Sequence, residues 1–332
     1  AHRIREILEG SRIGVFADNV RLDWDILSKR LWEKVDERPA IQSYYDQFPN
    51  VDPFNGTASI VDNHTVAIAL NDGSSVTLTG DKIFVATGGR TNIPSLPGLE
   101  EAGYLTSESF FGPSYPKKPY QSLIIIGGGP SGGEFAHVFD AAGTKVTMVQ
   151  HNVLLLPKED PAVSAFILKQ FQRYGMDIRL NKDTVSVSQR AGLKVLSFRD
   201  RTTGEEGEVA AEEILVAPGI RPMTELLHLE NTDVRLDKRG YIETNEFLET
   251  TAENIWALGD VNGLAPFRHK ANYEAEILAH NLFSGNEPET WRWADYDAVP
   301  AVTYTYPEAA HVGLTEDQAE KKGYDVEPAM NP

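Results

Sequence analysis

The sequence predicts an α/β fold with two Rossmann-like, three-layer dinucleotide-binding domains, and three observations support this prediction. The run SLIIIGGGPSGGE at 122–134 places a short apolar strand before a glycine loop and the start of a helix. A similar phrase occurs twice, as KIFVATGGR at 82–90 and as EILVAPGIR at 213–221. The run NIWALGD at 254–260 is a strand that ends in Gly-Asp and precedes a helix. Buried strands that alternate with helices are typical of parallel sheets.

The glycine loop has the spacing G-x-G-x-x-G that brings a protein backbone against a pyrophosphate. Gly127 permits the tight turn out of the strand, Gly129 has no Cβ to block a phosphate, and Gly132 lets helix and strand pack closely. The free N–H groups and the positive dipole end of the following helix then face the anion. An amphipathic helix at 134–142 and a second strand at 145–149 complete the expected setting. These neighbours favour a phosphate site over a mere glycine turn.

The composition excludes several classes of partner for the chain. The 332 residues are 41% hydrophobic and 24% charged, which is ordinary for a globular protein with more than one core. The net charge of −18 argues against nucleic-acid binding, which needs a basic surface. No apolar run approaches a membrane span and no leader pattern opens the chain, so we expect a cytoplasmic protein without a membrane partner. The absence of cysteine excludes a disulfide or a thiolate metal site within these residues.

The order of further elements follows from hydrophobic periodicity and turn signals. We expect helices at 1–9, at 24–48 with a break at Pro39, at 161–174 and at 270–283. Strands are expected within 56–85, around a turn at 71–73, and also at 176–180, and an antiparallel meander at 184–209. A linker is expected at 91–119, and a new element at 299–326. The helix that opens the chain has no cap and the last element stops abruptly, which indicates a piece of a larger protein.

The repeated phrase indicates a duplicated nucleotide-binding domain. Each copy runs from a strand through Val-Ala to a glycine and an arginine, and each is followed by a proline-containing segment that ends in Leu-Glu. Coincidence between two ordinary buried strands is the alternative.

Two strand ends carry side chains that could bind a cofactor. Asp260 could accept hydrogen bonds from a ribose or a sugar alcohol, or simply cap a turn. The helix that begins near His269 would offer N–H groups to partial negative charge, such as that of a reduced flavin. The strand at 145–149 is followed by Gln150, His151 and Asn152, with neither an acid for the ribose of NAD nor an arginine for the phosphate of NADP. With Lys158 nearby, the choice stays open and leans away from strict NAD.

The sequence gives little support for a metal site or a serine nucleophile. The eight histidines show no metal-ligand spacing, and His137 is predicted to pack within a helix face. Ser131 lies in the glycine loop and not in a nucleophile elbow. Trp291 and Trp293 are expected to pack between domains.

Taken together, these motifs resemble the FAD-dependent pyridine nucleotide-disulfide oxidoreductases, which include dihydrolipoamide dehydrogenase and glutathione, mercuric and mycothione reductases. The similarity runs over the whole chain through VATGG at 85–89, GGGPSGGEFA at 127–136, VAPGIRP at 216–222, ALGD at 257–260 and YTYPEAAHVGLTEDQA at 304–319. EFAHVF at 134–139 and the run at 268–282 are most similar to the mycothione and mercuric reductase branch.

The resemblance implies domains, cofactors and site residues. The implied domains are an incomplete first part of an FAD domain at 1–115, an NAD(P) domain at 116–242, a second FAD part at 243–297 and a truncated α+β dimerisation domain at 298–332. Glu134 matches the glutamate that the family places beside nicotinamide and flavin, normally with a lysine. The implied cofactor-binding residues are Ala58, Thr87, Gly88, Gly127, Gly129, Pro130, Ser131, Gly132, Gln150, His151, Val185, Gly219, Gly259, Asp260, Phe267, Arg268 and His269, and no metal ligand is implied.

The sequence departs from the family pattern in three respects, which limit how far the family's residue roles apply to this chain. Pro130 and Ser131 replace an aromatic or apolar pair, so an aromatic lid over the nicotinamide is missing, and Pro218 replaces a threonine. The family's first glycine loop, its C-x-x-x-x-C redox pair and its C-terminal His-Glu pair are absent. The chain resembles the middle of such an enzyme.

The implied activity is transfer of hydride from NAD(P)H through FAD to a small disulfide, lipoamide or a metal ion, in a protein that is a homodimer when intact. Without a thiol, this stretch alone is expected not to reduce disulfides. The alternatives are a cysteine-independent NAD(P)H oxidase or quinone reductase on the same fold, and a nucleotide-binding protein without turnover.

Overall fold

The computed structural model describes residues 1–35, 38–285 and 287–329, which belong to two compact units. Unit 1 comprises Ala1–Asp36, Thr91–Gly219 and Pro300–Pro332, and unit 2 comprises Glu37–Arg90 and Ile220–Val299. The domain limits expected from the resemblance stay predictions.

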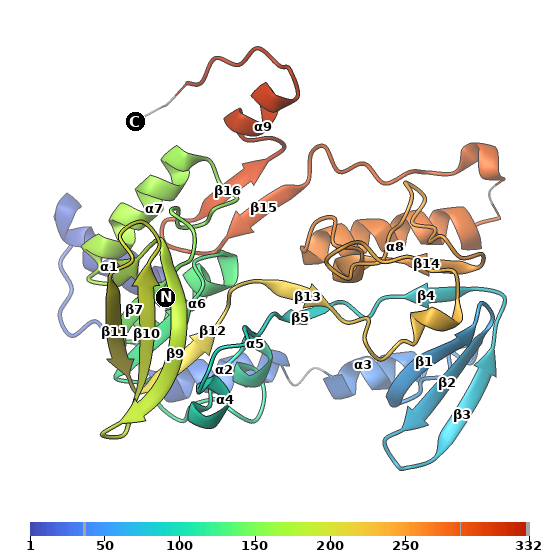
Figure 1. Cartoon of the computed structure of the whole chain (residues 1–332), viewed down its shortest axis with the longest axis horizontal. Coiled ribbons are helices and arrows are strands. Elements are labelled where there is room, and N and C mark those ends of the chain that lie inside the picture. The colour runs from blue at the N-terminus through green and yellow to red at the C-terminus, as the bar shows by residue number, and fades with distance from the viewer. Residues whose placement is uncertain (36–37, 286, 330–332) are drawn as a thin grey trace. The chain divides into compact units, whose positions relative to one another are not determined.

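Unit 1 is built around a parallel sheet of four strands in the order β12-β6-β7-β8. Strands β7 and β12 of this sheet are labelled in Figure 1. Its elements are α1 (His2–Glu9), η1 (Gly10–Ile13), α2 (Trp24–Val35), α4 (Leu99–Ala102), α5 (Ser107–Phe110), β6 (Ser122–Ile126), α6 (Pro130–Ala141), β7 (Lys145–Val149), α7 (Pro161–Arg173), β8 (Asp177–Arg179), β9 (Lys182–Arg190), β10 (Leu193–Asp200), β11 (Glu206–Ala211), β12 (Glu213–Val216), β15 (Pro300–Thr303), β16 (Ala309–Val312) and α9 (Glu316–Lys321).

The central strand β6 shows why this unit has three layers. Successive side chains of a strand point to opposite faces. Leu123 and Ile125 pack in a core with residues of α6 and α7, whereas Ile124 and Ile126 pack in a second core with the antiparallel sheet β11-β10-β9. Both faces of β6 are therefore buried, which explains its uninterrupted apolar sequence.

The second unit contains a parallel pair, β4 with β14, and a separate antiparallel sheet in the order β1-β2-β3. The remaining elements of the chain are α3 (Arg38–Tyr45), β1 (Gly56–Asp62), β2 (Thr65–Leu70), β3 (Ser75–Thr79), β4 (Ile83–Val85), β5 (Gly89–Thr91), β13 (Ile220–Pro222), η2 (Leu229–Asn231), β14 (Ile255–Ala257), η3 (Gly259–Asn262), α8 (Arg268–Phe283) and η4 (Pro288–Thr290).

The register of β4 and β14 positions the second part of the candidate site. Ile83 pairs with Ile255 and Val85 with Ala257 in a parallel ladder, so both strands end at the same edge. Trp256 turns to the opposite face, where it packs in a core with Ile277 and Leu278 of α8.

Most expected elements are present, and the α/β fold class is confirmed. The strand at 145–149, the meander and the helix from Pro161 occur as expected. The helical region 24–48 forms α2 and α3, with Pro39 as the second residue of α3; residues 36–37 between them lie outside the described part.

The expectation of a linker at 91–119 is wrong in part. This stretch contains α4 and α5, and Leu105 forms a parallel bridge with Leu215 beside the sheet of unit 1. Leu99, Leu105 and Phe110 are buried. The proline and glycine residues gave a loop signal, but the apolar side chains between them are used in the core.

The two copies of the repeated phrase fold alike. Each copy forms a strand, β4 or β12, which runs into a glycine with positive φ: Gly88 at 71° and Gly219 at 132°. Positive φ is readily adopted only by glycine, so the shared sequence pattern reflects a shared backbone shape.

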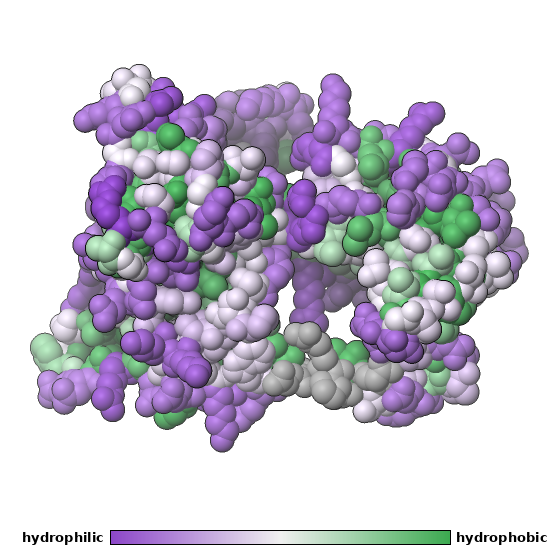
Figure 2. All heavy atoms as spheres, turned by 60° about the horizontal axis from the view of Figure 1, so that its bottom comes forward, coloured by the Kyte–Doolittle hydropathy of each residue, from purple (hydrophilic) through white to green (hydrophobic). Residues whose placement is uncertain are grey.

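Polar residues predominate on the face of the molecule seen in Figure 2, and hydrophobic residues form small separate groups on it. Within the described residues, no helix is both long enough and apolar enough to cross a membrane.

Candidate functional site

The glycine loop connects β6 to α6, and Gly127 makes its first turn. Its φ is 111°, and a Cβ at this position would lie 2.3 Å from the carbonyl oxygen of Ala217. The Gly127 N–H donates to the carbonyl oxygen of Val149 at 2.9 Å, which ties the loop to the end of β7. Glycine is required here for both conformation and space.

The other two glycines of the motif differ in their surroundings. A Cβ at Gly132 would lie 2.1 Å from the carbonyl oxygen of Gly127, so α6 approaches the loop as closely as a backbone can. A Cβ at Gly129 would meet no heavy atom within 4 Å. Close packing at one position and open space at the other are the local geometry that a pyrophosphate loop needs. The predicted binding by these residues remains a prediction.

The first turn of α6 leaves backbone donors for a ligand. Gly129 is the N-cap of the helix and supplies no side-chain hydrogen bond. Pro130 occupies the first helical position, where its missing N–H costs nothing, and the Ser131 side chain is exposed. The unpaired N–H groups and the dipole of such a helix end attract an anion.

The two polar side chains that follow β7 have different surroundings. Gln150 is buried; its Oε1 accepts the Gly128 N–H at 3.0 Å and its Nε2 donates to the carbonyl oxygen of Leu154 at 3.3 Å. Gln150 therefore supports the loop. His151 is exposed, and its Nδ1 lies 2.7 Å from Oδ1 of Asp183.

A cavity of about 400 Å³ opens beside the glycine loop. Among the residues that line it are Gly127, His151, Asp183 and Thr184. Val185, the predicted contact on β9, is half-buried next to Thr184. A Cβ at Gly219, another predicted contact, would meet open space.

Glu134 lies in the second turn of α6 and is half-buried. Its Oε1 accepts the N–H of Tyr304 at 3.0 Å. Desolvation raises the pKa of this carboxyl group, and the hydrogen bond from Tyr304 partly opposes the shift. Across the described residues, no cation forms an ion pair with Glu134, so the lysine expected from the resemblance is not supplied by this part of the chain.

The shared edge of β4 and β14 brings together four of the predicted flavin-binding residues. Thr87 and Gly88 follow β4, and Gly259 and Asp260 follow β14. A Cβ at Gly88 would meet no heavy atom within 4 Å, which leaves the backbone open to a ligand. Burial raises the pKa of Asp260, although Lys270 acts in the opposite direction.

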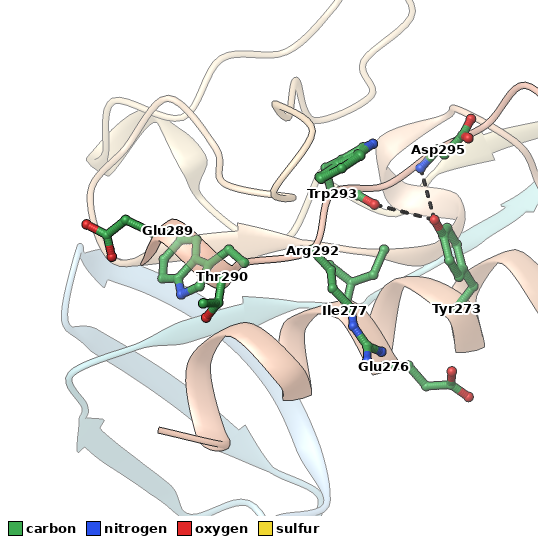
Figure 3. Close-up of a pocket in the computed structure, with 9 residues that line it drawn as sticks. Tyr273, Glu276, Ile277, Glu289, Thr290, Arg292, Trp293 and Asp295 are labelled. Carbon is green, nitrogen blue, oxygen red and sulfur yellow. Dashed lines mark hydrogen bonds between the residues drawn. The ribbon is translucent and has the colours of Figure 1, made fainter. Parts of the chain in front are cut away.

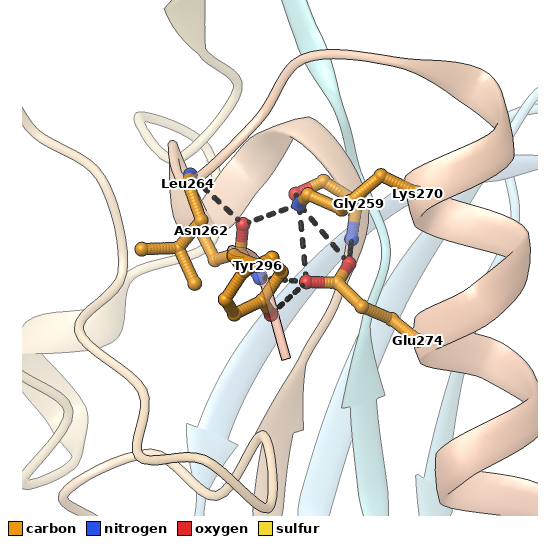
Figure 4. A network of polar contacts seen from close by, with 6 residues as sticks. All are labelled: Gly259, Asn262, Leu264, Lys270, Glu274 and Tyr296. Carbon is orange, nitrogen blue, oxygen red and sulfur yellow. Dashed lines mark hydrogen bonds and ion pairs between the residues drawn. The ribbon is translucent and has the colours of Figure 1, made fainter. Parts of the chain in front are cut away.

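The turn around Asp260 is held by a buried polar network (Figure 4). The Gly259 N–H donates to Glu274 Oε2 at 2.7 Å, and the Gly259 carbonyl oxygen accepts from Lys270 Nζ at 3.0 Å. Lys270 Nζ also donates to Asn262 Oδ1 at 2.7 Å. The peptide groups on either side of Gly259 are thus bound by two opposite charges.

Glu274 completes the network with its second oxygen. Oε1 accepts from Asn262 Nδ2 at 2.8 Å and from the hydroxyl group of Tyr296 at 2.6 Å. The side chains of Lys270 and Glu274 are fully buried. Burial lowers the pKa of Lys270, and the charge of Glu274 opposes this. Sequence reasoning missed this pair, although Lys and Glu four residues apart on a helix is a recognisable signal.

The N-terminus of α8 holds three further predicted residues. Phe267 is the N-cap and makes no side-chain cap hydrogen bond, and Arg268 begins the helix. The ring of His269 stacks on that of Phe267 with centroids 5.3 Å apart. Ala58, the remaining predicted residue, is exposed on β1 in the separate antiparallel sheet, and its contact with a cofactor remains a prediction.

A cavity of about 550 Å³ lies along α8, where sequence reasoning expected none (Figure 3). Tyr273 and Glu276 of the helix line it together with Trp291, Arg292 and Trp293. The Tyr273 hydroxyl group accepts the N–H of Asp295 at 3.0 Å and donates to the carbonyl oxygen of Trp293 at 3.4 Å. Trp293 is 63% exposed, so within unit 2 it is not a packed side chain.

His137 is buried, as expected of a packing residue. Its ring lies edge-on to His2 at 4.9 Å between centroids and stacks on Tyr306 at 6.4 Å. Burial lowers the pKa of His137 to about 3, so the ring is neutral at pH 7. In the part of the chain that the structure describes, no group of three or more His, Asp or Glu could hold a metal ion.

Known proteins share both the sequence and the fold of this chain. A family model described as pyridine nucleotide-disulphide oxidoreductase matches residues 1–294, and the model of the dimerisation domain of these proteins matches residues 299–332. A mercuric reductase from Staphylococcus aureus is 34% identical over 281 residues, which are 85% of this chain and 49% of the relative. A dihydrolipoyl dehydrogenase from Mycobacterium bovis is 30% identical over 313 residues, which are 94% of this chain and 66% of the relative.

Solved structures agree with these matches. The HOCl-induced flavoprotein disulfide reductase RclA from Escherichia coli superposes with a TM-score of 0.80 at 28% sequence identity, over 98% of this chain and 70% of that chain. The chain spans about half to two thirds of the length of the two curated relatives above. With a family model that matches most of its residues, the chain belongs to the pyridine nucleotide-disulphide oxidoreductase family.

Proposed function

We propose that the chain forms the nicotinamide-binding part and a portion of the flavin-binding part of an oxidoreductase that passes hydride from NAD(P)H through FAD to an acceptor. The observation that carries the proposal is the glycine loop, with a packed Gly132, an open Gly129 and a start of α6 that no side chain caps. Membership of the family supports the pairing of this site with a flavin.

The residues present fit a nicotinamide dinucleotide and part of FAD. Backbone N–H groups at the start of α6 would bind the pyrophosphate, since Gly129 leaves that approach open. Glu134 would face the nicotinamide side as a partly desolvated carboxyl group. Asp260, held by the Lys270–Glu274 network, would accept hydrogen bonds from the ribityl chain of FAD. When bound, the flavin supplies the hydride acceptor, and the protein supplies alignment and electrostatics.

The acceptor is proposed by class. The relatives named above include a mercuric reductase and a dihydrolipoyl dehydrogenase, which favours a metal ion, lipoamide or another small disulfide. The match to a dimerisation domain supports a homodimer for the intact protein, and we propose a cytoplasmic location. The absence of cysteine from the 332 residues means that a disulfide acceptor would need thiols outside them.

Binding and reduction experiments test this function. We expect the purified chain to bind NADH or NADPH in a calorimetric titration, and the full-length protein to be yellow with FAD and to be bleached by NADH or NADPH without oxygen. A chain that binds neither FAD nor a nicotinamide dinucleotide would contradict the proposal. A bleached flavin that passes electrons to oxygen or a quinone, in a full-length protein without a cysteine pair, would instead favour the oxidase or quinone reductase alternative.

A further inference from the structure

We propose that Asp183, at the start of β9, is the residue that selects NADH over NADPH. The inference rests on the proposed function, because it concerns the adenosine end of the same dinucleotide. In a Rossmann-like unit, the side chains that follow the second strand meet the adenosine ribose, and an acid there holds its 2′-hydroxyl group. Here that strand is β7, and Gln150 and His151 follow it.

The first of these residues does not face the ribose. Gln150 is 5% exposed, and both polar atoms of its side chain bind within the chain, to the Gly128 N–H and to the carbonyl oxygen of Leu154. Both residues line the cavity, but His151, whose side chain is 59% exposed, is the first of this segment that is open to a ligand.

Backbone hydrogen bonds fix Asp183 beside His151. The N–H of Lys182 donates to the carbonyl oxygen of Gln150 at 3.0 Å, and the N–H of Asn181 donates to the carbonyl oxygen of Asn152 at 2.9 Å. The entry to β9 thus runs alongside the exit from β7. Asp183 lines the cavity with its carboxylate 2.7 Å from His151 Nδ1, so an acid lies beside the residues that follow β7.

The carboxylate of Asp183 also lies close to a second basic side chain, that of Arg201. Arg201 Nε lies 3.4 Å from Asp183 Oδ1, and Arg201 Nη1 donates to the carbonyl oxygen of His151 at 3.4 Å. Lys182, which lines the cavity, forms an ion pair with Asp200. A 2′-phosphate carries a charge of about −1.5 to −2 at pH 7 and would have to compete with Asp183 for Arg201 and with Asp200 for Lys182. The hydroxyl groups of NADH would instead donate to the carboxylate.

Calorimetric titration of the whole chain with NADH and NADPH tests this assignment. We expect NADH to bind the unchanged chain about tenfold tighter or more, since like charges oppose the 2′-phosphate. Asp183→Asn keeps the size of the side chain and frees His151 and Arg201, so NADPH should gain on NADH by about tenfold. Adding Arg201→Gln to this variant should remove the gain.

Glu208→Gln is the matched control. Glu208 is an exposed carboxylate in an ion pair with Arg190 on the meander and does not line the cavity, so the preference should not change. Equal affinities, a preference for NADPH, or an Asp183→Asn variant with an unchanged ratio would each overturn the assignment while leaving the dinucleotide site intact. An unchanged chain that binds neither nucleotide would overturn the proposed function itself, and the assignment with it.

Discussion

Gly129 and Gly132 are only three residues apart, yet the chain uses them in opposite ways. At Gly132 a methyl group would meet the carbonyl oxygen of Gly127 at 2.1 Å, whereas at Gly129 it would point into open space. One glycine is required by the fold, and the other by the ligand that we propose.

Alanine substitutions separate these roles. Gly132→Ala overpacks the contact between α6 and the loop and should lower the free energy of unfolding by about 1–3 kcal/mol. Gly129→Ala should leave thermal unfolding unchanged but weaken NADH binding roughly tenfold, or about 1.4 kcal/mol. Denaturant unfolding and calorimetric titration of both variants check this, and equal effects of the two substitutions on both measurements would contradict it.

His137 makes stability depend on pH. Its pKa is lowered to about 3 by burial and returns to about 6.5 in the unfolded chain. Between these values the unfolded chain binds one more proton, so this contribution to stability is present above pH 6.5 and is lost as the pH falls toward 3. The slope is at most about 1.4 kcal/mol per pH unit.

His137→Leu should therefore flatten the dependence of the unfolding free energy on pH below 6.5. The same substitution at the exposed His64 is the control and should retain the slope. Denaturant titrations at several pH values provide the measurement. An unchanged slope in His137→Leu would show that the ring is not kept neutral by burial.

Local pattern predicted the loop residues, but not their partners. The roles of Gly127, Gly129 and Gly132 follow from spacing alone, because strand, turn and helix are contiguous there. Asp183 comes to His151 from 32 residues along the chain, through backbone hydrogen bonds between the exit from β7 and the entry to β9. A reading of strand ends one at a time could not have found this contact.

At the scale of the element, α8 anchors the Gly259–Asp260 turn as well as packing on β14. Lys270 and Glu274 are one helical turn apart, and both face the core rather than solvent. A buried ion pair is strongly destabilised when one partner is removed, because the other charge is left without compensation.

Lys270→Met should therefore lower the free energy of unfolding by about 3–5 kcal/mol. Combining it with Glu274→Gln should recover part of the loss, since no charge is then left buried. Glu208→Gln, which breaks the exposed pair with Arg190, should change little. Thermal and denaturant unfolding of the four proteins tests this, and a Lys270→Met variant as stable as the control would contradict it.

Elements with strong periodicity were predicted well, and the segment 91–119 was not. In the strand β7 and the meander, local propensity, hydrophobic pattern and turn residues all favour the structure that forms. In 91–119, short helices of four residues rely on Leu99 and Phe110 being buried against the rest of unit 1. Local propensity carries little information about such tertiary burial.

At the scale of the whole molecule, the absence of cysteine limits the chemistry of the chain. With NADH supplied, we expect the 332-residue chain not to reduce oxidised glutathione, whereas the full-length protein with FAD bound should reduce ferricyanide, which needs only electrons from the flavin. Parallel assays of the two acceptors check this. Reduction of glutathione disulfide by this chain would contradict the expectation that thiols outside it are required.

The central claim is that the loop at 127–132 binds the pyrophosphate of a nicotinamide dinucleotide. A crystal structure of the chain with NADH tests it most directly. We predict that the pyrophosphate lies against Gly129 and the first N–H groups of α6, with the adenosine ribose beside Asp183. A dinucleotide bound elsewhere, with the N–H groups at the start of α6 left to solvent, would contradict the account.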